Sequence, residues 1–130
     1  VLMASRLEKE KNIDMAIDAF AEVLKMRQNV GLVIVGDGSQ KKLLEKKAKD
    51  LGIEGSVVFL GWQNDVITYY KTCDIFLSTS WYEGYGLSLV EAHSLGIKVV
   101  STDVGIAKEL NLKIVKFDKT SIAWGIIENI

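Results

Sequence analysis

Short apolar runs alternate with amphipathic helical stretches along this chain, and this alternation limits the possible folds more than any other feature. The runs lie at residues 1–4, 31–36, 56–61, 74–79 and 98–102, with 113–117 as a candidate for a sixth. A continuous apolar run such as GLVIVG is typical of a strand buried on both faces. Strands that alternate with helices form a parallel sheet with helices on both faces. The pattern therefore predicts an α/β, Rossmann-like fold.

The expected helices cover residues 12–27, 39–52, 64–73, 87–96 and 120–130. Polar residues suited to N-caps stand before three of them: Asn12, Ser39, and Asn64 or Asp65. Glycines that suit the C-terminal end follow two of them, at Gly52 and Gly96.

Length and composition fit one globular domain of 130 residues, with 48% hydrophobic and 25% charged residues. The net charge of −1 offers no basic surface for nucleic acid. The one cysteine, Cys73, cannot form an internal disulfide and indicates a reducing compartment, so we expect a cytoplasmic protein. The one histidine, His93, has no ligand partner at metal-binding spacing, and we expect it to be packed or half-exposed. We therefore expect no metal and no cofactor.

Two glycine-containing stretches resemble phosphate-binding motifs but lack residues that those motifs need. GDGSQK at residues 36–41 lacks the third glycine of a dinucleotide fingerprint and follows the second strand instead of the first. GLVIVGD at residues 31–37 has glycines at P-loop spacing, but Asp37 replaces the lysine and the first half is a strand. Dehydrogenase and P-loop functions are excluded on these grounds. Nothing resembles the nucleophile elbow of an α/β-hydrolase.

Ligands of such sheets bind beyond the carboxyl ends of the strands, where the strand order reverses. That rule places five loops on one rim: residues 5–12, 36–39, 61–65, 79–87 and 102–107.

The stretch WYEGYGLSLVEAHSLG, residues 81–96, combines a glycine turn with a helix on this rim. Gly84 and Gly86 permit a tight turn and a close approach of the main chain to a ligand. A helix that begins near Gly86 directs free N–H groups to the rim, which suits a phosphate. Glu91, about one turn into this helix, can accept hydrogen bonds from a ribose diol. Glu83, before the turn, can accept hydrogen bonds from the hydroxyls of a sugar that lies beyond the phosphates.

The first rim loop supplies cations that suit a diphosphate, namely Arg6 and Lys11. A site for a nucleoside diphosphate sugar needs carboxylates that bind hydroxyls, and cations and a helix N-terminus that bind the phosphates. The rim offers two such carboxylates, two such cations and one such helix N-terminus. Each residue taken alone also fits a simpler role, as a turn cap, a solvated helix residue or a surface charge. The two glutamates are not interpreted as a glycosidase acid/base pair, because their expected partners are hydroxyls at opposite ends of the donor.

At these residues the chain resembles a known family. The matching stretches include SRLEKEKN, LVIVGDGSQKKLLE, VVFLGW and CDIFLSTSWYEGYGLSLVEAHSLGIKVVSTDVG, with Glu109 shortly after. They resemble the C-terminal, donor-binding domain of a GT-B glycosyltransferase of family 4, the retaining group 1 enzymes. The likeness covers residues 3–109 in the right order and is strongest at the segment that carries Glu83 and Glu91.

The resemblance implies a role for each matching residue. Arg6 and Lys11 would neutralise the diphosphate, Glu83 would bind the donor sugar, and Glu91 would hold the ribose. The residues whose backbone would line the sugar and phosphates are Gly84, Tyr85, Gly86 and Leu87. Gly61 and Trp62 would face the base, and Trp62 would stack on it or pack half-buried.

Three departures from the family pattern stand out. Ser5 replaces a glycine before the Arg-Leu pair, Lys98 replaces a proline, and Ile106 replaces a glycine. The last of these puts backbone contacts from residues 105–107 in doubt.

The expected function is the donor-binding half of a retaining glycosyltransferase, with residues 1–130 as the donor domain and the acceptor domain absent from this chain. The donor would be UDP-, GDP- or ADP-linked, and the acceptor a glycan or a lipid-linked molecule. The full-length protein would be cytoplasmic, with peripheral association to a membrane as a possibility. This fragment alone would bind donor without turnover. The alternatives are a non-catalytic nucleotide-binding or partner-binding module and the donor half of a glycogen or starch synthase relative.

Overall fold

The computed structural model describes residues 1–130 and contains a single six-stranded sheet in which every pair is parallel. The strands are β1 (Leu2–Ala4), β2 (Leu32–Val35), β3 (Val57–Gly61), β4 (Ile75–Ser78), β5 (Lys98–Thr102) and β6 (Lys113–Val115). The α-helices are α1 (Ile13–Met26), α2 (Lys41–Asp50), α3 (Val66–Thr72), α4 (Leu87–Ser94) and α5 (Lys119–Ile127). Two short 3₁₀ helices, Lys9–Lys11 and Glu54–Ser56, precede α1 and β3. The predicted α/β fold class is confirmed.

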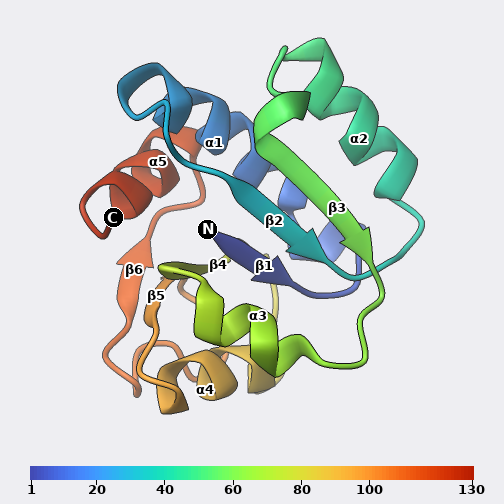
Figure 1. Cartoon of the computed structure of the whole chain (residues 1–130). Coiled ribbons are helices and arrows are strands. Elements are labelled where there is room, and N and C mark those ends of the chain that lie inside the picture. The colour runs from blue at the N-terminus through green and yellow to red at the C-terminus, as the bar shows by residue number, and fades with distance from the viewer.

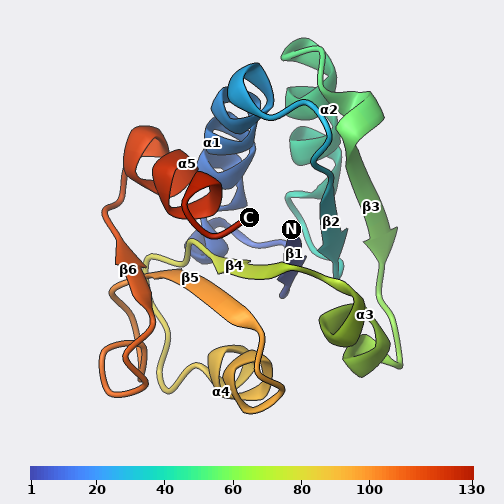
Figure 2. The same cartoon turned by 60° about the vertical axis from the view of Figure 1, so that its left-hand side comes forward.

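Helices cover both faces of the sheet, as Figures 1 and 2 show. One face packs against α1, α2 and α5, with α1 residues such as Phe20 in its core. The other face packs against α3 and α4 through Tyr70 and Leu89. Neighbouring strand residues divide between the two cores, since Phe76 joins the second and Leu77 the first. This alternation along each strand is the period of two that a pleated sheet imposes.

The strand order is β3-β2-β1-β4-β5-β6, so the direction of winding reverses between β1 and β4. β1 pairs with β2 on one side and with β4 on the other, where Leu2 lies opposite Phe76. Loops that leave the carboxyl ends of β1 and β4 diverge at such a point and leave a crevice between them. The loops that carry Lys11 and Glu83 follow these two strands.

Most predicted helix boundaries are confirmed, but Ser39 is not an N-cap. The helix begins at Lys41 with Gln40 at the cap position, and the Ser39 backbone N–H donates to Glu8 Oε1 at 3.1 Å. Asp65 does cap α3, because its carboxylate accepts from the Thr68 N–H at 3.2 Å. Asn12 precedes α1 as predicted but forms no side-chain cap. Some polar side chains of the rim therefore link one loop to another, as Glu8 does, and others cap a helix, as Asp65 does.

Two further observations concern the surface. His93 is exposed on α4, instead of packed or half-exposed as the sequence suggested. None of the helices combines the length and apolar character that crossing a membrane requires.

Candidate functional site

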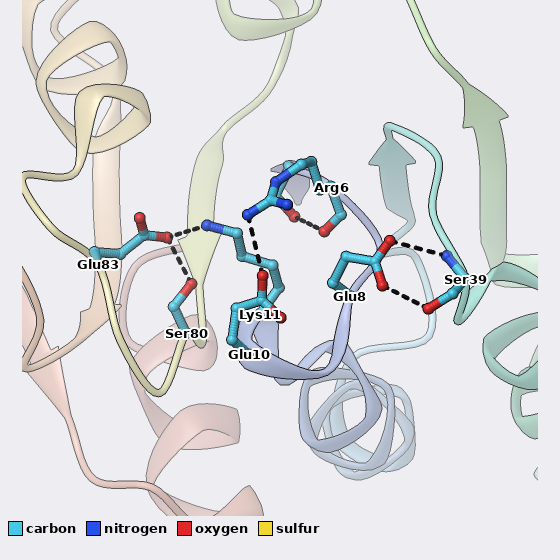
Figure 3. A network of polar contacts seen from close by, with 8 residues as sticks. Arg6, Glu8, Glu10, Lys11, Ser39, Ser80 and Glu83 are labelled. Carbon is cyan, nitrogen blue, oxygen red and sulfur yellow. Dashed lines mark hydrogen bonds and ion pairs between the residues drawn. The ribbon is translucent and has the colours of Figure 1, made fainter.

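Lys11 and Glu83 form an ion pair across the switch point of the sheet. Lys11 Nζ donates to Glu83 Oε1 at 2.7 Å, and the two side chains are 14% and 17% exposed. Ser80 Oγ donates to the same oxygen at 2.8 Å. No protein group donates to Glu83 Oε2, and Figure 3 shows this oxygen pointing away from Lys11. Glu83 is therefore held by one oxygen, and its other oxygen accepts no hydrogen bond from the protein.

Buried hydroxyls fix the main chain on both sides of this pair. Thr79 Oγ1, which is fully buried, donates to the carbonyl oxygens of Lys11 and Asn12 at 3.0 Å. Thr102 Oγ1 donates to the Ser80 carbonyl oxygen at 2.7 Å. Asn12 itself adopts the left-handed conformation with φ of 52°, which asparagine tolerates better than most residues. The loops after β1 and β4 and the last residue of β5 are thus tied together next to the ion pair.

Arg6 has a different carboxylate partner. Arg6 Nη2 donates to Glu10 Oε1 at 3.1 Å, and its side chain is 69% exposed (Figure 3). An exposed pair of this kind contributes little to stability, so a stronger anion can displace it at small cost. The two predicted phosphate-binding cations therefore come from one loop, but each is paired with its own carboxylate.

A cavity of about 650 Å³ opens beside β1, between α3 and α4. It brings together three of the residues predicted from the sequence, namely Arg6, Trp62 and Glu91. Much of its remaining wall is apolar and includes Val66, Ile67, Tyr70, Val90 and Leu95. A small-molecule site of this size, apolar with a few polar groups, suits a nucleoside.

A second, very small pocket of about 10 Å³ holds Lys11 and Glu83. Ala4, Ser5 and Ser88 line both this pocket and the large cavity. The two regions therefore adjoin at the end of β1 and the first turn of α4. The four residues that the sequence assigned to one site, Arg6, Lys11, Glu83 and Glu91, divide between these two adjoining pockets, which together form the crevice.

Comparison with known proteins identifies the family of the chain. The model of the family described as glycosyl transferases group 1 matches residues 1–116. The chain belongs to the group 1 glycosyltransferases. The family named from sequence motifs is thereby confirmed.

Individual relatives place this glycosyltransferase domain among longer proteins. Alpha-monoglucosyldiacylglycerol synthase of Streptococcus pneumoniae is 39% identical over 103 residues, which cover 78% of this chain and 23% of that protein. A mutant of S. aureus TarM, solved in complex with Fondaparinux, alpha-GlcNAc-glycerol and UDP, is 27% identical with a TM-score of 0.92, over 98% of this chain and 28% of TarM. Anabaena HepE in complex with UDP-glucose is 30% identical with a TM-score of 0.87, over 98% of this chain and 38% of HepE. The chain thus spans well under half of each of these proteins, and its fold is that of GT-B glycosyltransferases.

The glycine turn of this glycosyltransferase domain is built as the sequence predicts. Gly86, with φ of 94°, is the N-cap of α4, which begins at Leu87. Gly105 packs closely against this turn, because a Cβ atom at residue 105 would lie 2.3 Å from the Tyr85 carbonyl oxygen. Ile106 N–H donates to that oxygen at 2.9 Å. The departure from the family at Ile106 therefore leaves the contact between these two loops in place.

Some predicted ligand residues lie beside the crevice without lining either pocket. Gly84, Tyr85 and Leu87 are exposed. Gly61 lies at the end of β3, where its carbonyl oxygen accepts from the Gly36 N–H at 2.8 Å. Trp62 is 74% exposed over the cavity, so it does not pack half-buried. The roles of all these residues toward a ligand stay predictions.

Sequence reasoning missed the hydroxyl residues of the crevice. Ser80 and Thr79 support the ion pair, and Ser5 and Ser88 lie where the two pockets meet. The run STS at residues 78–80, directly after an apolar strand, was the one available signal. No group of three or more His, Cys, Asp or Glu side chains could hold a metal ion, and the expected absence of a metal stays a prediction.

Proposed function

We propose that this chain binds a nucleoside diphosphate sugar in the crevice and serves as the donor-binding part of a retaining glycosyltransferase. The observation that carries the proposal is the junction of the two pockets at Ser5 and Ser88. The nucleoside would occupy the large cavity, with its ribose at Glu91 and its base against Trp62. The sugar would lie at Glu83.

The diphosphate would lie between these two groups, where Arg6 and the N-terminus of α4 face the crevice. Cleavage of the bond from sugar to phosphate leaves a negative charge on the departing nucleoside diphosphate. Fixed cations and helix N–H groups stabilise that charge most strongly in the transition state. Arg6 and Lys11 are therefore assigned to the leaving group.

Glu83 would accept hydrogen bonds from hydroxyls of the donor sugar through its free Oε2 atom. Lys11 and Ser80 hold the other oxygen, so the carboxylate is already oriented when the sugar arrives. This arrangement uses Glu83 for positioning, and no proton transfer is assigned to it. Retention of configuration rests on the family resemblance.

The names of the relatives support a proposal for the donor and acceptor classes. Two of the solved relatives are named as complexes with UDP or UDP-glucose, so we propose a UDP-linked donor before GDP or ADP. The names of other relatives point to lipids and lipid-linked glycans, such as diacylglycerol and diphospho-undecaprenol. An acceptor of that class, in a longer cytoplasmic protein that associates with a membrane surface, is the proposal for the whole enzyme.

Calorimetric titration with UDP, GDP and ADP tests the proposal. We expect saturable 1:1 binding, with UDP the tightest of the three. In Arg6→Ala the preference for UDP over UMP should fall about tenfold, as for loss of one hydrogen bond to a charged group. Arg27→Ala is the matched control, because Arg27 is the residue after α1 and lines a pocket separate from the crevice. Absence of heat with all three nucleotides would reject the function.

A further inference from the structure

The Glu91 carboxylate has a single hydrogen-bonding partner within the protein. Tyr70 Oη lies 3.4 Å from Glu91 Oε2, and Glu91 takes part in no ion pair. Glu91 is exposed on α4, and an exposed glutamate samples several rotamers. Ordering such a side chain when a ligand binds costs free energy. The Tyr70 hydroxyl is therefore the protein contact that can restrict this carboxylate beforehand.

Tyr70 is itself rigidly placed. It is 1% exposed, and its ring packs on Phe76 of β4 with centroids 5.1 Å apart. It also belongs to the same core cluster as Leu89 and Ala92 of α4, the helix that carries Glu91. The hydroxyl thus projects from a fixed ring on α3 toward Glu91. Both residues line the large cavity.

The hydroxyl stays a donor at ordinary pH. Burial raises the pKa of Tyr70, and the negative charge of Glu91 raises it further. The protonated phenol can donate its hydrogen to Glu91 Oε2. A carboxylate offers about four acceptor positions, so Glu91 Oε1 remains free to accept from a ligand.

We propose that Tyr70 is a positioning residue, which holds the Glu91 carboxylate toward the ribose hydroxyls of a bound nucleoside diphosphate. Through Glu91, Tyr70 sets the selectivity of the site for ribose over deoxyribose. This inference rests on the proposed function and adds a residue to it. Tyr70 acts through Glu91 and takes no part in the chemical step. Similar second contacts behind ligand-binding side chains fix their geometry in many sites.

The test compares the affinities of UDP and 2′-deoxy-UDP for wild type and Tyr70→Phe, which keeps the ring and removes the hydroxyl. Wild type should prefer UDP about tenfold, the effect of one hydrogen bond to a charged group. Tyr70→Phe should reduce that preference to about threefold. The matched control is Tyr69→Phe, which removes a hydroxyl of the same helix that donates to Gln63 at 3.2 Å. It should keep the wild-type preference.

The ratio of two affinities measured on one protein separates positioning from folding. A fall in the folded, competent fraction weakens both nucleotides by the same factor and leaves the ratio unchanged. If Tyr70→Phe kept the wild-type preference for UDP over 2′-deoxy-UDP, whether or not both affinities fell, the inference would be overturned. The proposed function would still stand. A wild type that binds both nucleotides equally would remove the ribose contact of Glu91 and the inference with it. A wild type that binds neither would reject the proposed function itself.

Discussion

The two parts of the crevice differ in how completely the protein satisfies its own polar groups. In the small pocket, Lys11, Ser80 and Glu83 form a compact network with about 10 Å³ of free space. In the large cavity, about 650 Å³ is open and Glu91 has one long hydrogen bond. The first region is assembled in advance, whereas the second leaves room for its ligand.

This difference indicates how each region would meet a donor. The large cavity can accept a nucleoside without breaking a strong protein contact. On the proposed function, the small pocket would exchange part of its internal network for the sugar and the phosphates. The hydrogen bond from Thr79 to the Lys11 carbonyl oxygen would keep the main chain of Lys11 in place. We therefore expect substitutions of Lys11, Ser80 or Glu83 in the small pocket to affect both stability and binding, and substitution of the Glu91 side chain in the large cavity to affect binding alone.

Gly36→Ala should produce the largest effect, because Gly36 lines the large cavity directly against the backbone of Ser5, a residue that lines both pockets. A Cβ atom there would lie 1.8 Å from the Ser5 carbonyl oxygen, and φ is +133°. We expect a loss of about 3 kcal/mol or more in the free energy of unfolding, seen as a fall of about 10 °C in Tm by circular dichroism. Gly96→Ala is the control, because φ is +74° there but no atom lies within 4 Å. Equal losses in both variants would contradict the close approach of Gly36 to Ser5.

Lys11→Ala should destabilise the chain by about 2 kcal/mol, because it leaves the part-buried Glu83 without its cation. Lys46→Ala serves as control, since its pair with Asp50, at 2.6 Å, is as close as the 2.7 Å pair of Lys11 and Glu83 to within 0.1 Å, but both of its side chains are mostly exposed. That variant should lose less than about 0.5 kcal/mol. Urea denaturation measures both. If the two losses were alike, the small pocket would be no more preorganised than the surface.

Glu91→Ala should lower UDP affinity about tenfold and leave Tm within about 1 °C of wild type, because its one hydrogen bond to the protein is long. Glu45→Ala, an exposed change on α2, should alter neither quantity. Calorimetry and thermal denaturation on the same samples check the pair. Unchanged affinity in Glu91→Ala would remove the ribose assignment.

Ser39→Ala should have the smallest effect. Hydrogen bonds from Ser39 lower the pKa of Glu8, so the stability they add is present above the ordinary pKa and is lost as pH falls through the lowered one. In Ser39→Ala the pKa of Glu8 should rise toward its ordinary value. Carboxyl NMR titration measures it, with Glu22, whose pKa is lowered by Lys25, as the unaffected reference. A pKa of Glu8 that stays as low as in wild type would show that the Ser39 hydroxyl is not its cause, because the alanine variant keeps the Ser39 backbone N–H.

The sheet, its two helical layers and the rim were predictable because they follow from local patterns. Each apolar run forms one strand, and parallel strands bring their carboxyl ends to one edge. The partners of individual charges were not predictable, since Lys11 and Glu83 are 72 positions apart and meet only through the pairing of β1 with β4. Ser39 is not a cap, since its N–H and hydroxyl donate to the Glu8 carboxylate and the helix begins only at Lys41. Tyr70 is part of a predicted helix, and only its contact with α4 shows that its hydroxyl faces Glu91.

The most direct test of the account is an amide NMR titration of the chain with UDP and then with UDP-glucose. UDP should shift resonances at Arg6, Trp62 and Glu91 around the large cavity, and at Lys11, which is assigned to the diphosphate. UDP-glucose should shift these and also Glu83, because its sugar reaches the small pocket. Shifts confined to separate surfaces, or no shifts with either ligand, would contradict a single donor site formed by the two pockets.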